Sequence, residues 1–86
     1  MQNPAISETY PKSLDSPGKR ALFDNLGKNE ALALSVDESI RASRQDDWRN
    51  NPFKIKRVRL AIKSVLDGDE TLIEKTLELV KNQNEY

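Results

Sequence analysis

The sequence predicts an all-α fold, a small bundle of about four helices behind an extended N-terminal lead-in. Four separate segments repeat apolar side chains every three or four residues, which is the period of a helix with one buried face. Each segment follows a pattern that starts helices, either Ser or Asn before Pro, or Asn or Asp before Glu. About a third of the 86 residues are apolar and a third are charged, which suffices for one domain with a thin core.

The beginning of the chain is the expected lead-in. Residues 1–15 contain two prolines and no apolar period, which is typical of an extended segment. We assign residues 16–86 to the helical domain. Tyr10 and Leu14 are the side chains expected to attach the lead-in to that domain.

The first two helices are expected at about residues 17–26 and 30–43. Ser16 caps the first helix, with Pro17 at its first helical position, and Asn29 caps the second. The second helix has a regular apolar stripe, formed by Leu32, Val36 and Ile40. Its opposite, polar face is formed by Ser35, Asp37, Glu38 and Arg41.

The third helix is predicted to have two apolar faces. A polar connector that contains Trp48 precedes it, and Asn51 and Pro52 start it by the cap-and-proline pattern. Its main apolar sector consists of Ile55, Val58, Ile62, Val65 and Leu66. Leu60 lies away from this sector, on the same side as Phe53. Such a helix is either covered on both sides or presents an apolar patch to a partner.

The fourth helix is expected from about residue 70 to residue 81. The acidic turn Asp67–Glu70 ends the third helix and caps the fourth, because its carboxylates favour the positive end of the new helix dipole. Its apolar face consists of Leu72, Ile73, Leu77, Leu79 and Val80.

The zero net charge conceals an uneven distribution. Residues 44–63 carry seven basic and two acidic side chains, a net charge of +5, whereas residues 64–86 carry two basic and six acidic ones, a net charge of −4. Two interpretations remain open. Either the third and fourth helices neutralise each other within the fold, or the third presents an electropositive face to a partner.

The composition argues against catalysis by these residues. The chain has no Cys and no His, which removes the commonest metal ligands, the commonest general base and every triad that needs imidazole. Gly18-Lys19-Arg20 lacks the other residues of a phosphate-binding loop, and the acidic pattern from Asp67 lacks the central Gly of a calcium loop. We therefore expect no enzyme activity, no cofactor and no metal in this chain.

The sequence also lacks the signals of a membrane or secreted protein. No apolar run approaches the length of a membrane span, and the first residues do not have the pattern of a signal peptide. We expect a soluble, cytoplasmic protein.

The basic, aromatic-edged segment around the start of the third helix is the candidate functional surface. A protein-docking surface would use Trp48, Arg49, Phe53, Lys56, Arg59, Leu60 and Lys63. The alternative, a duplex-DNA contact through the basic face of residues 54–63, would use Lys54, Lys56, Arg57, Arg59 and Lys63. Two further alternatives stay open: Trp48 and Phe53 cover one end of the bundle, or the domain only braces a larger protein.

Three separated blocks of sequence carry a family resemblance. They are P-G-K-R-A-L-F-D-N-L-G-K-N-E-A-L-A-L from Pro17, D-D-W-R-N-N-P-F-K-I-K-R-V from Asp46, and L-E-L-V-K-N-Q-N-E-Y from Leu77. With these blocks, the chain from about residue 10 to its end resembles the C-terminal domain of the restriction (R) subunit of type I restriction-modification enzymes. Each block is a helix signature and not a catalytic motif.

The resemblance implies a non-catalytic piece of a large DNA-translocating motor. The parent enzyme is an ATP-dependent type I site-specific deoxyribonuclease that cleaves unmethylated DNA, and its nuclease and helicase-like domains, which use ATP and Mg²⁺, precede the helical region. The terminal domain is expected to attach the R subunit to the methyltransferase core. The implied partners are therefore the methylation and specificity subunits and the rest of the R subunit, with DNA as the alternative.

Overall fold

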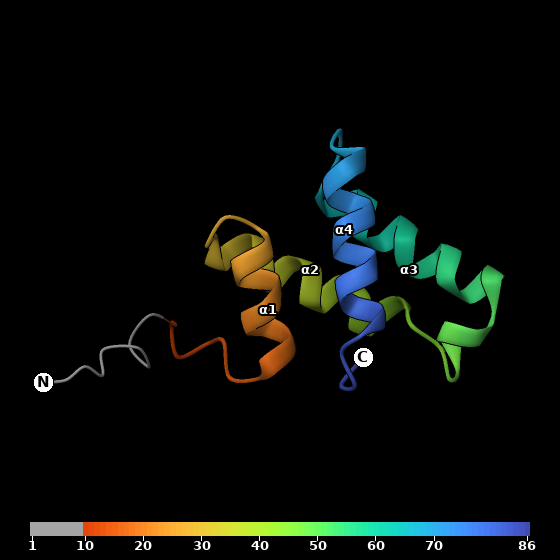
Figure 1. Cartoon of the computed structure of the whole chain (residues 1–86), viewed down its shortest axis with the longest axis horizontal. Coiled ribbons are helices and arrows are strands. Elements are labelled where there is room, and N and C mark those ends of the chain that lie inside the picture. The colour runs from red at the N-terminus through yellow and green to blue at the C-terminus, as the bar shows by residue number, and fades with distance from the viewer. Residues whose placement is uncertain (1–9) are drawn as a thin grey trace, which may run out of the picture.

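Four α-helices and one short 3-10 helix make up the part of the chain that the structure describes. The computed structural model describes residues 10–86, so residues 1–9 of the predicted lead-in lie outside the described residues. The elements are α1 (Pro17–Asn25), α2 (Glu30–Ser43), η2 (Trp48–Asn50), α3 (Pro52–Val65) and α4 (Glu70–Lys81) (Figure 1). No strand occurs among residues 10–86. The predicted all-α fold of about four helices is confirmed, whereas η2 was not predicted.

A side-chain cap starts each of the four α-helices, as the sequence predicts. The side chains of Ser16, Asn29 and Asp69 each accept a hydrogen bond from the backbone N–H three residues ahead, at 3.0–3.3 Å. Asn51 accepts from two backbone N–H groups, at 2.9 and 3.3 Å. These bonds satisfy donors that have no partner inside the helix, so local sequence alone fixes where each helix begins.

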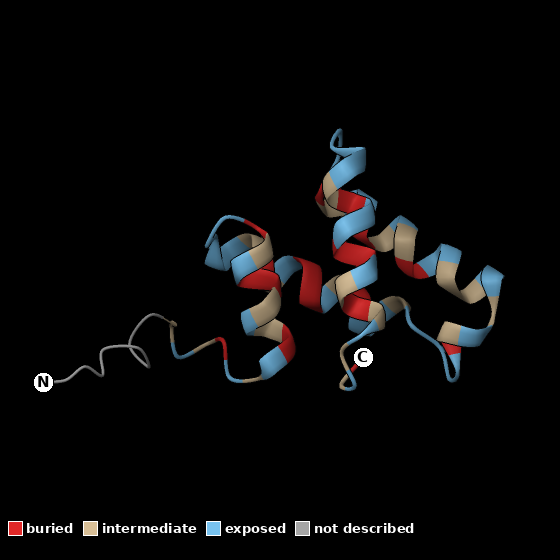
Figure 2. Ribbon diagram, in the orientation of Figure 1, coloured by how far each residue is buried: buried red, intermediate tan, exposed pale blue. Residues whose placement is uncertain are grey.

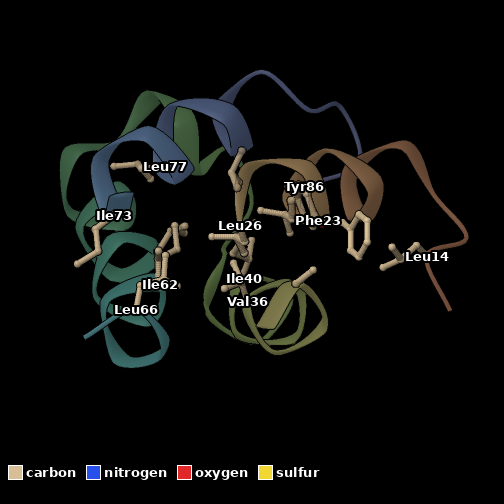
Figure 3. Close-up of a cluster of buried hydrophobic side chains, with 14 of the residues drawn as sticks. Leu14, Phe23, Leu26, Val36, Ile40, Ile62, Leu66, Ile73, Leu77 and Tyr86 are labelled. Atoms are coloured by element: carbon tan, nitrogen blue, oxygen red, sulfur yellow. The ribbon is translucent and has the colours of Figure 1, made fainter. Parts of the chain in front are cut away.

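The helices close around one core to which every α-helix contributes. α2 packs against both α1 and α3, and α4 packs against α3 and α1. In Figure 3 the core runs from Leu14 and Phe23 at one end to Ile62 and Ile73 at the other. Asn25 on α1 also donates a hydrogen bond to the buried Thr76 on α4, at 2.8 Å.

The described part of the lead-in is fixed to the domain. Leu14 is fully buried in the core, and its carbonyl oxygen accepts a hydrogen bond from Arg20 Nε at 2.9 Å. The Tyr10 hydroxyl donates to Asp24 at 2.6 Å, and its ring meets Phe23 edge-on at 5.8 Å between centroids. Tyr10 and Leu14 therefore attach the lead-in as predicted, and the core of the domain extends before residue 16.

The last two residues of the sequence form a polar anchor between α1 and α2, which the sequence analysis missed. The Glu85 carboxylate accepts hydrogen bonds from Gly18 N at 2.8 Å, from Ser16 Oγ at 2.7 Å and from Arg41 Nη2 at 2.7 Å. It lies at the N-terminus of α1, where the helix dipole and free N–H groups favour an anion. We call this group of residues, with Asp37 and Tyr86, the Glu85–Tyr86 anchor.

Tyr86 and Asp37 form the buried half of the anchor. The Tyr86 hydroxyl donates to Asp37 Oδ1 at 2.5 Å, and Arg41 Nε donates to both Asp37 carboxylate oxygens at 3.0 and 3.1 Å. The Arg41 guanidinium also lies 4.8 Å from the Tyr86 ring centroid. Asp37, which the sequence places on the polar face of the second helix, is buried, since only 4% of it is exposed. Its charge is tolerated there because Arg41 and Tyr86 satisfy it.

Gly18 is required by the close approach of the anchor. A Cβ atom at this position would lie 2.6 Å from Glu85 Cδ and 2.8 Å from Tyr86 Cε2. The resemblance of Gly18-Lys19-Arg20 to a phosphate-binding loop thus has a structural explanation. The first turn of α1 does bind an anion, and that anion is a carboxylate of the same chain.

The hydroxyl of Tyr86 should matter far more to stability than that of Tyr10. Tyr86→Phe leaves a buried carboxylate short of one hydrogen bond, which costs about 1–3 kcal/mol. Tyr10→Phe is the matched control, because it removes an equally short hydrogen bond to a carboxylate at an exposed position. Urea denaturation of both variants compares the two losses of unfolding free energy, and equal losses would contradict the role assigned to the anchor.

The stabilisation from Glu85 should depend on pH. Burial alone would raise the pKa of Glu85, but hydrogen bonds from Ser16 and Gly18 and the charge of Arg41 hold it below its ordinary value of 4.5. A carboxylate whose pKa is lowered by folding stabilises the fold above its unfolded pKa and loses that contribution as pH falls through the folded pKa. The wild type should therefore exceed Glu85→Gln in unfolding free energy at about pH 7. That difference should shrink below the ordinary pKa of 4.5. Denaturation across this range measures it, and a difference independent of pH would contradict the assignment.

Candidate docking surface

The outer face of α3 carries the two large apolar side chains that are most exposed in the described part of the chain. Phe53 is 80% exposed and Leu60 is 50% exposed. They are seven residues apart, so two helical turns place them on the same side of α3. Lys56 and Arg57 stand between them, three or four residues from each, and both are exposed. In Figure 2 exposed stretches alternate with less exposed ones along α3. We define these four residues as the outer face of α3.

The opposite side of α3 belongs to the core. Val58 and Ile62 are fully buried, and Ile55 is partly buried and packs against the same cluster. The prediction of two apolar faces on this helix is confirmed. One face is covered by α2 and α4, whereas no element within residues 10–86 covers Phe53 or Leu60.

The cations of α3 divide into two groups. Arg59 pairs with Glu74 at 2.5 Å and with Glu70 at 3.0 Å, and Lys63 lies 3.9 Å from Glu70. The hydrogen bond that Arg59 donates to the Glu74 carboxylate raises the pKa of Arg59 above its ordinary value. In contrast, Lys56 and Arg57 form no ion pair within the described residues. The first interpretation, neutralisation between the third and fourth helices, therefore holds for Arg59 and Lys63, and the second stays a prediction for Lys56 and Arg57.

This division shows which of the predicted site residues have partners within the fold. Arg59 and Lys63 were predicted to contact a protein partner or DNA, but their charges are directed at α4 because the helix after the acidic turn runs back along α3. Lys54, predicted for the DNA contact, donates through Nζ to the carbonyl oxygen of Asp46 at 2.8 Å. Lys56 and Arg57 are the cations of the predicted sets that remain on the outer face.

Trp48 is a core residue and not a surface anchor. Its side chain is 2% exposed, and its indole N–H meets no acceptor within residues 10–86. Its large apolar ring therefore accounts for its burial. The prediction that Trp48 contacts a partner is corrected accordingly, because Trp48 belongs to the buried core whereas Phe53 is exposed. The two aromatic residues, close in sequence, have opposite environments.

Arg49 is likewise occupied within the domain. Its Nε donates to the carbonyl oxygen of Lys81 at 2.8 Å, and Nη2 donates to that of Gln83 at 2.5 Å. The guanidinium also lies 5.1 Å from the Trp48 ring centroid. A cation at the end of α4 satisfies carbonyl groups that lack partners in the helix. Arg49 thus joins η2 to the end of α4. We therefore do not include Arg49, which was predicted to contact a partner, in the outer face of α3.

The two groups of cations should respond differently to charge reversal. Lys56→Glu changes an exposed, unpaired charge, so its thermal unfolding midpoint should stay close to that of the wild type. Arg59→Glu adds a third carboxylate beside Glu70 and Glu74 and should lower the midpoint clearly. Thermal melts followed by circular dichroism at low salt measure the unfolding midpoints of both variants. The two midpoints should converge in high salt, which screens the repulsion, and equal melts at low salt would contradict the division.

No protein-family model, no curated protein and no solved structure matches this chain. Within residues 10–86 no group of three or more His, Cys, Asp or Glu residues is placed to hold a metal ion. None of the helices in that part of the chain has both the length and the apolar character that crossing a membrane demands. The family resemblance thus depends on the three sequence blocks given above, and the outer face of α3 is defined without it.

Proposed function

We propose that this chain is a non-catalytic helical module that docks a larger enzyme subunit onto a protein partner through the outer face of α3. One observation carries the proposal. Phe53 and Leu60 are exposed on one side of a helix whose other side is fixed in the core. Apolar side chains exposed together mark interaction surfaces, and aromatic residues and Arg are enriched in interface cores.

The sequence resemblance supports a specific setting for this module. In a type I restriction-modification enzyme it would be the C-terminal domain of the R subunit, and its partner would be the methyltransferase core of methylation and specificity subunits. ATP and Mg²⁺ would act in the preceding domains of the R subunit. In that setting the chain would be cytoplasmic and would serve DNA cleavage by positioning the motor.

The duplex-DNA alternative is the weaker one. Two of its five predicted cations, Arg59 and Lys63, already face the carboxylates of Glu70 and Glu74. Non-specific DNA affinity comes mainly from cations that neutralise phosphates, so each cation paired within the fold lowers it. The side chains of Phe53 and Leu60 have neither a charge nor a hydrogen-bond donor with which to bind a phosphate. A protein partner accounts for the apolar and the basic residues of the face together.

The test is assembly with the methyltransferase core. The 86-residue chain, mixed with that core at about 50 μM, should co-elute from a size-exclusion column. Phe53→Ala/Leu60→Ala should weaken binding at least about tenfold, because buried anchors contribute most of the binding free energy. Lys12→Glu/Lys75→Glu, which reverses two exposed charges elsewhere, should bind like the wild type.

Two outcomes would overturn this proposal. If wild type and core do not co-elute at that concentration, the partner is wrong. If the folded double-alanine variant binds as well as the wild type, the outer face is not the contact and the module acts as a brace. A short duplex serves as the control for the alternative. Binding to it should fall by about 0.9 log units per decade of salt for each phosphate contact, if it occurs at all.

A further inference from the structure

The geometry of the outer face of α3 points to the kind of element that covers it. We infer that this element is an amphipathic helix of another protein, with carboxylates on both sides of an apolar stripe. The inference deepens the proposed function and depends on it for the existence of a partner. The chemistry of the partner is argued from the four exposed residues themselves.

The spacing of the apolar residues fits a helix. Phe53 and Leu60 are two turns apart on α3, which corresponds to about 10.5 Å along the axis. Helices pack side by side at axis separations of about 8–10 Å, by fitting side chains of one between those of the other. A partner helix with apolar residues at i, i+3 or i+4, and i+7 would contact both Phe53 and Leu60. One element of regular shape thus covers both residues.

The charges between these residues set the polarity of the partner. Any element that spans from Phe53 to Leu60 must pass over Lys56 and Arg57, which have no carboxylate partner within residues 10–86. Removing unpaired cations from water is costly unless an opposite charge replaces the water. The partner helix must therefore present carboxylates beside its apolar stripe.

A second copy of this chain does not satisfy that requirement. Lys56 and Arg57 lie midway between the two apolar residues, so an antiparallel pair of α3 helices would place the same cations of both copies at the centre of the contact. A parallel pair would bring like residues together as well. Like charges in a contact are repulsive and suppress that pairing. The face is thus matched to a different, acidic surface.

Phosphate surfaces fit less well than an acidic helix. Lys56, Arg59 and Lys63 follow one another at intervals of three and four residues, so they share one side of α3. The carboxylates of Glu70 and Glu74 lie on that side, paired with Arg59. Duplex DNA or an anionic membrane would meet these carboxylates as well as the cations, whereas a helix can follow the line from Phe53 to Leu60.

A matched pair of peptides tests the inference on the full chain. The first probe is a synthetic helical peptide of about 16 residues, long enough to form a helix, with a leucine stripe flanked by Glu. The second has Lys in place of every Glu. In NMR titrations the Glu peptide should shift the amide signals of Phe53, Arg57 and Leu60, and should bind at least about tenfold more tightly than the Lys peptide. Phe53→Ala/Leu60→Ala should lose this binding.

A charge exchange gives the sharpest form of the test. The variant Lys56→Glu/Arg57→Glu should prefer the Lys peptide, whereas Lys12→Glu/Lys75→Glu should keep the preference of the wild type. The inference is overturned if the Glu peptide causes no shifts, if both peptides bind equally, or if a duplex or anionic vesicles occupy the face in its place.

The two proposals fail separately. Assembly with the methyltransferase core without binding of the Glu peptide would leave the proposed function standing and remove the acidic helix. Binding of the Glu peptide through the outer face without assembly would support the acidic helix and remove the methyltransferase core as the partner.

Discussion

The carboxylate of Glu85 at the first turn of α1 is the contact on which the rest of the domain depends. It joins the end of the sequence to Ser16 and Gly18 on one side and to Arg41 of α2 on the other. A chain with so small an apolar fraction cannot rely on its core alone, because domains of this size bury little surface per residue. The Glu85–Tyr86 anchor adds a polar network that is fully satisfied, which rigidifies the packing of α1 on α2.

The packing of α2 and α4 determines which sides of α3 are covered. α2 and α4 cover its inner side, and α4 also pairs its carboxylates with Arg59 and Lys63. The inner side and one flank of the helix are therefore fixed within the fold. The outer face of α3, with two apolar residues and two cations, stays exposed. In the proposed docking, a face on a helix that is packed into the core would lose little conformational entropy, which favours affinity from a small contact area.

Local features were predictable from the sequence, and contacts between distant residues were not. The four caps and the helix bounds, within about a residue, depend on neighbours three or four positions away. The burial of Asp37 depends on Tyr86, 49 positions away, and the position of Trp48 depends on the packing around η2. Residue spacing also could not predict which cations of α3 form ion pairs, because that depends on where α4 packs against α3. The pair Asp37 and Arg41, four residues apart, was the one local sign of the anchor.

In the proposed docking, the arrangement of charges on the outer face of α3 would oppose pairing between copies of this chain although Phe53 and Leu60 are exposed. Two apolar residues exposed on a regular helix would favour self-association if the residues between them were neutral. Lys56 and Arg57 stand at that point, and no carboxylate within residues 10–86 pairs with them. The same cations would attract the acidic helix proposed as the partner. Specificity for that partner would then come from two charges left unpaired while their neighbours on α3 are paired within the fold.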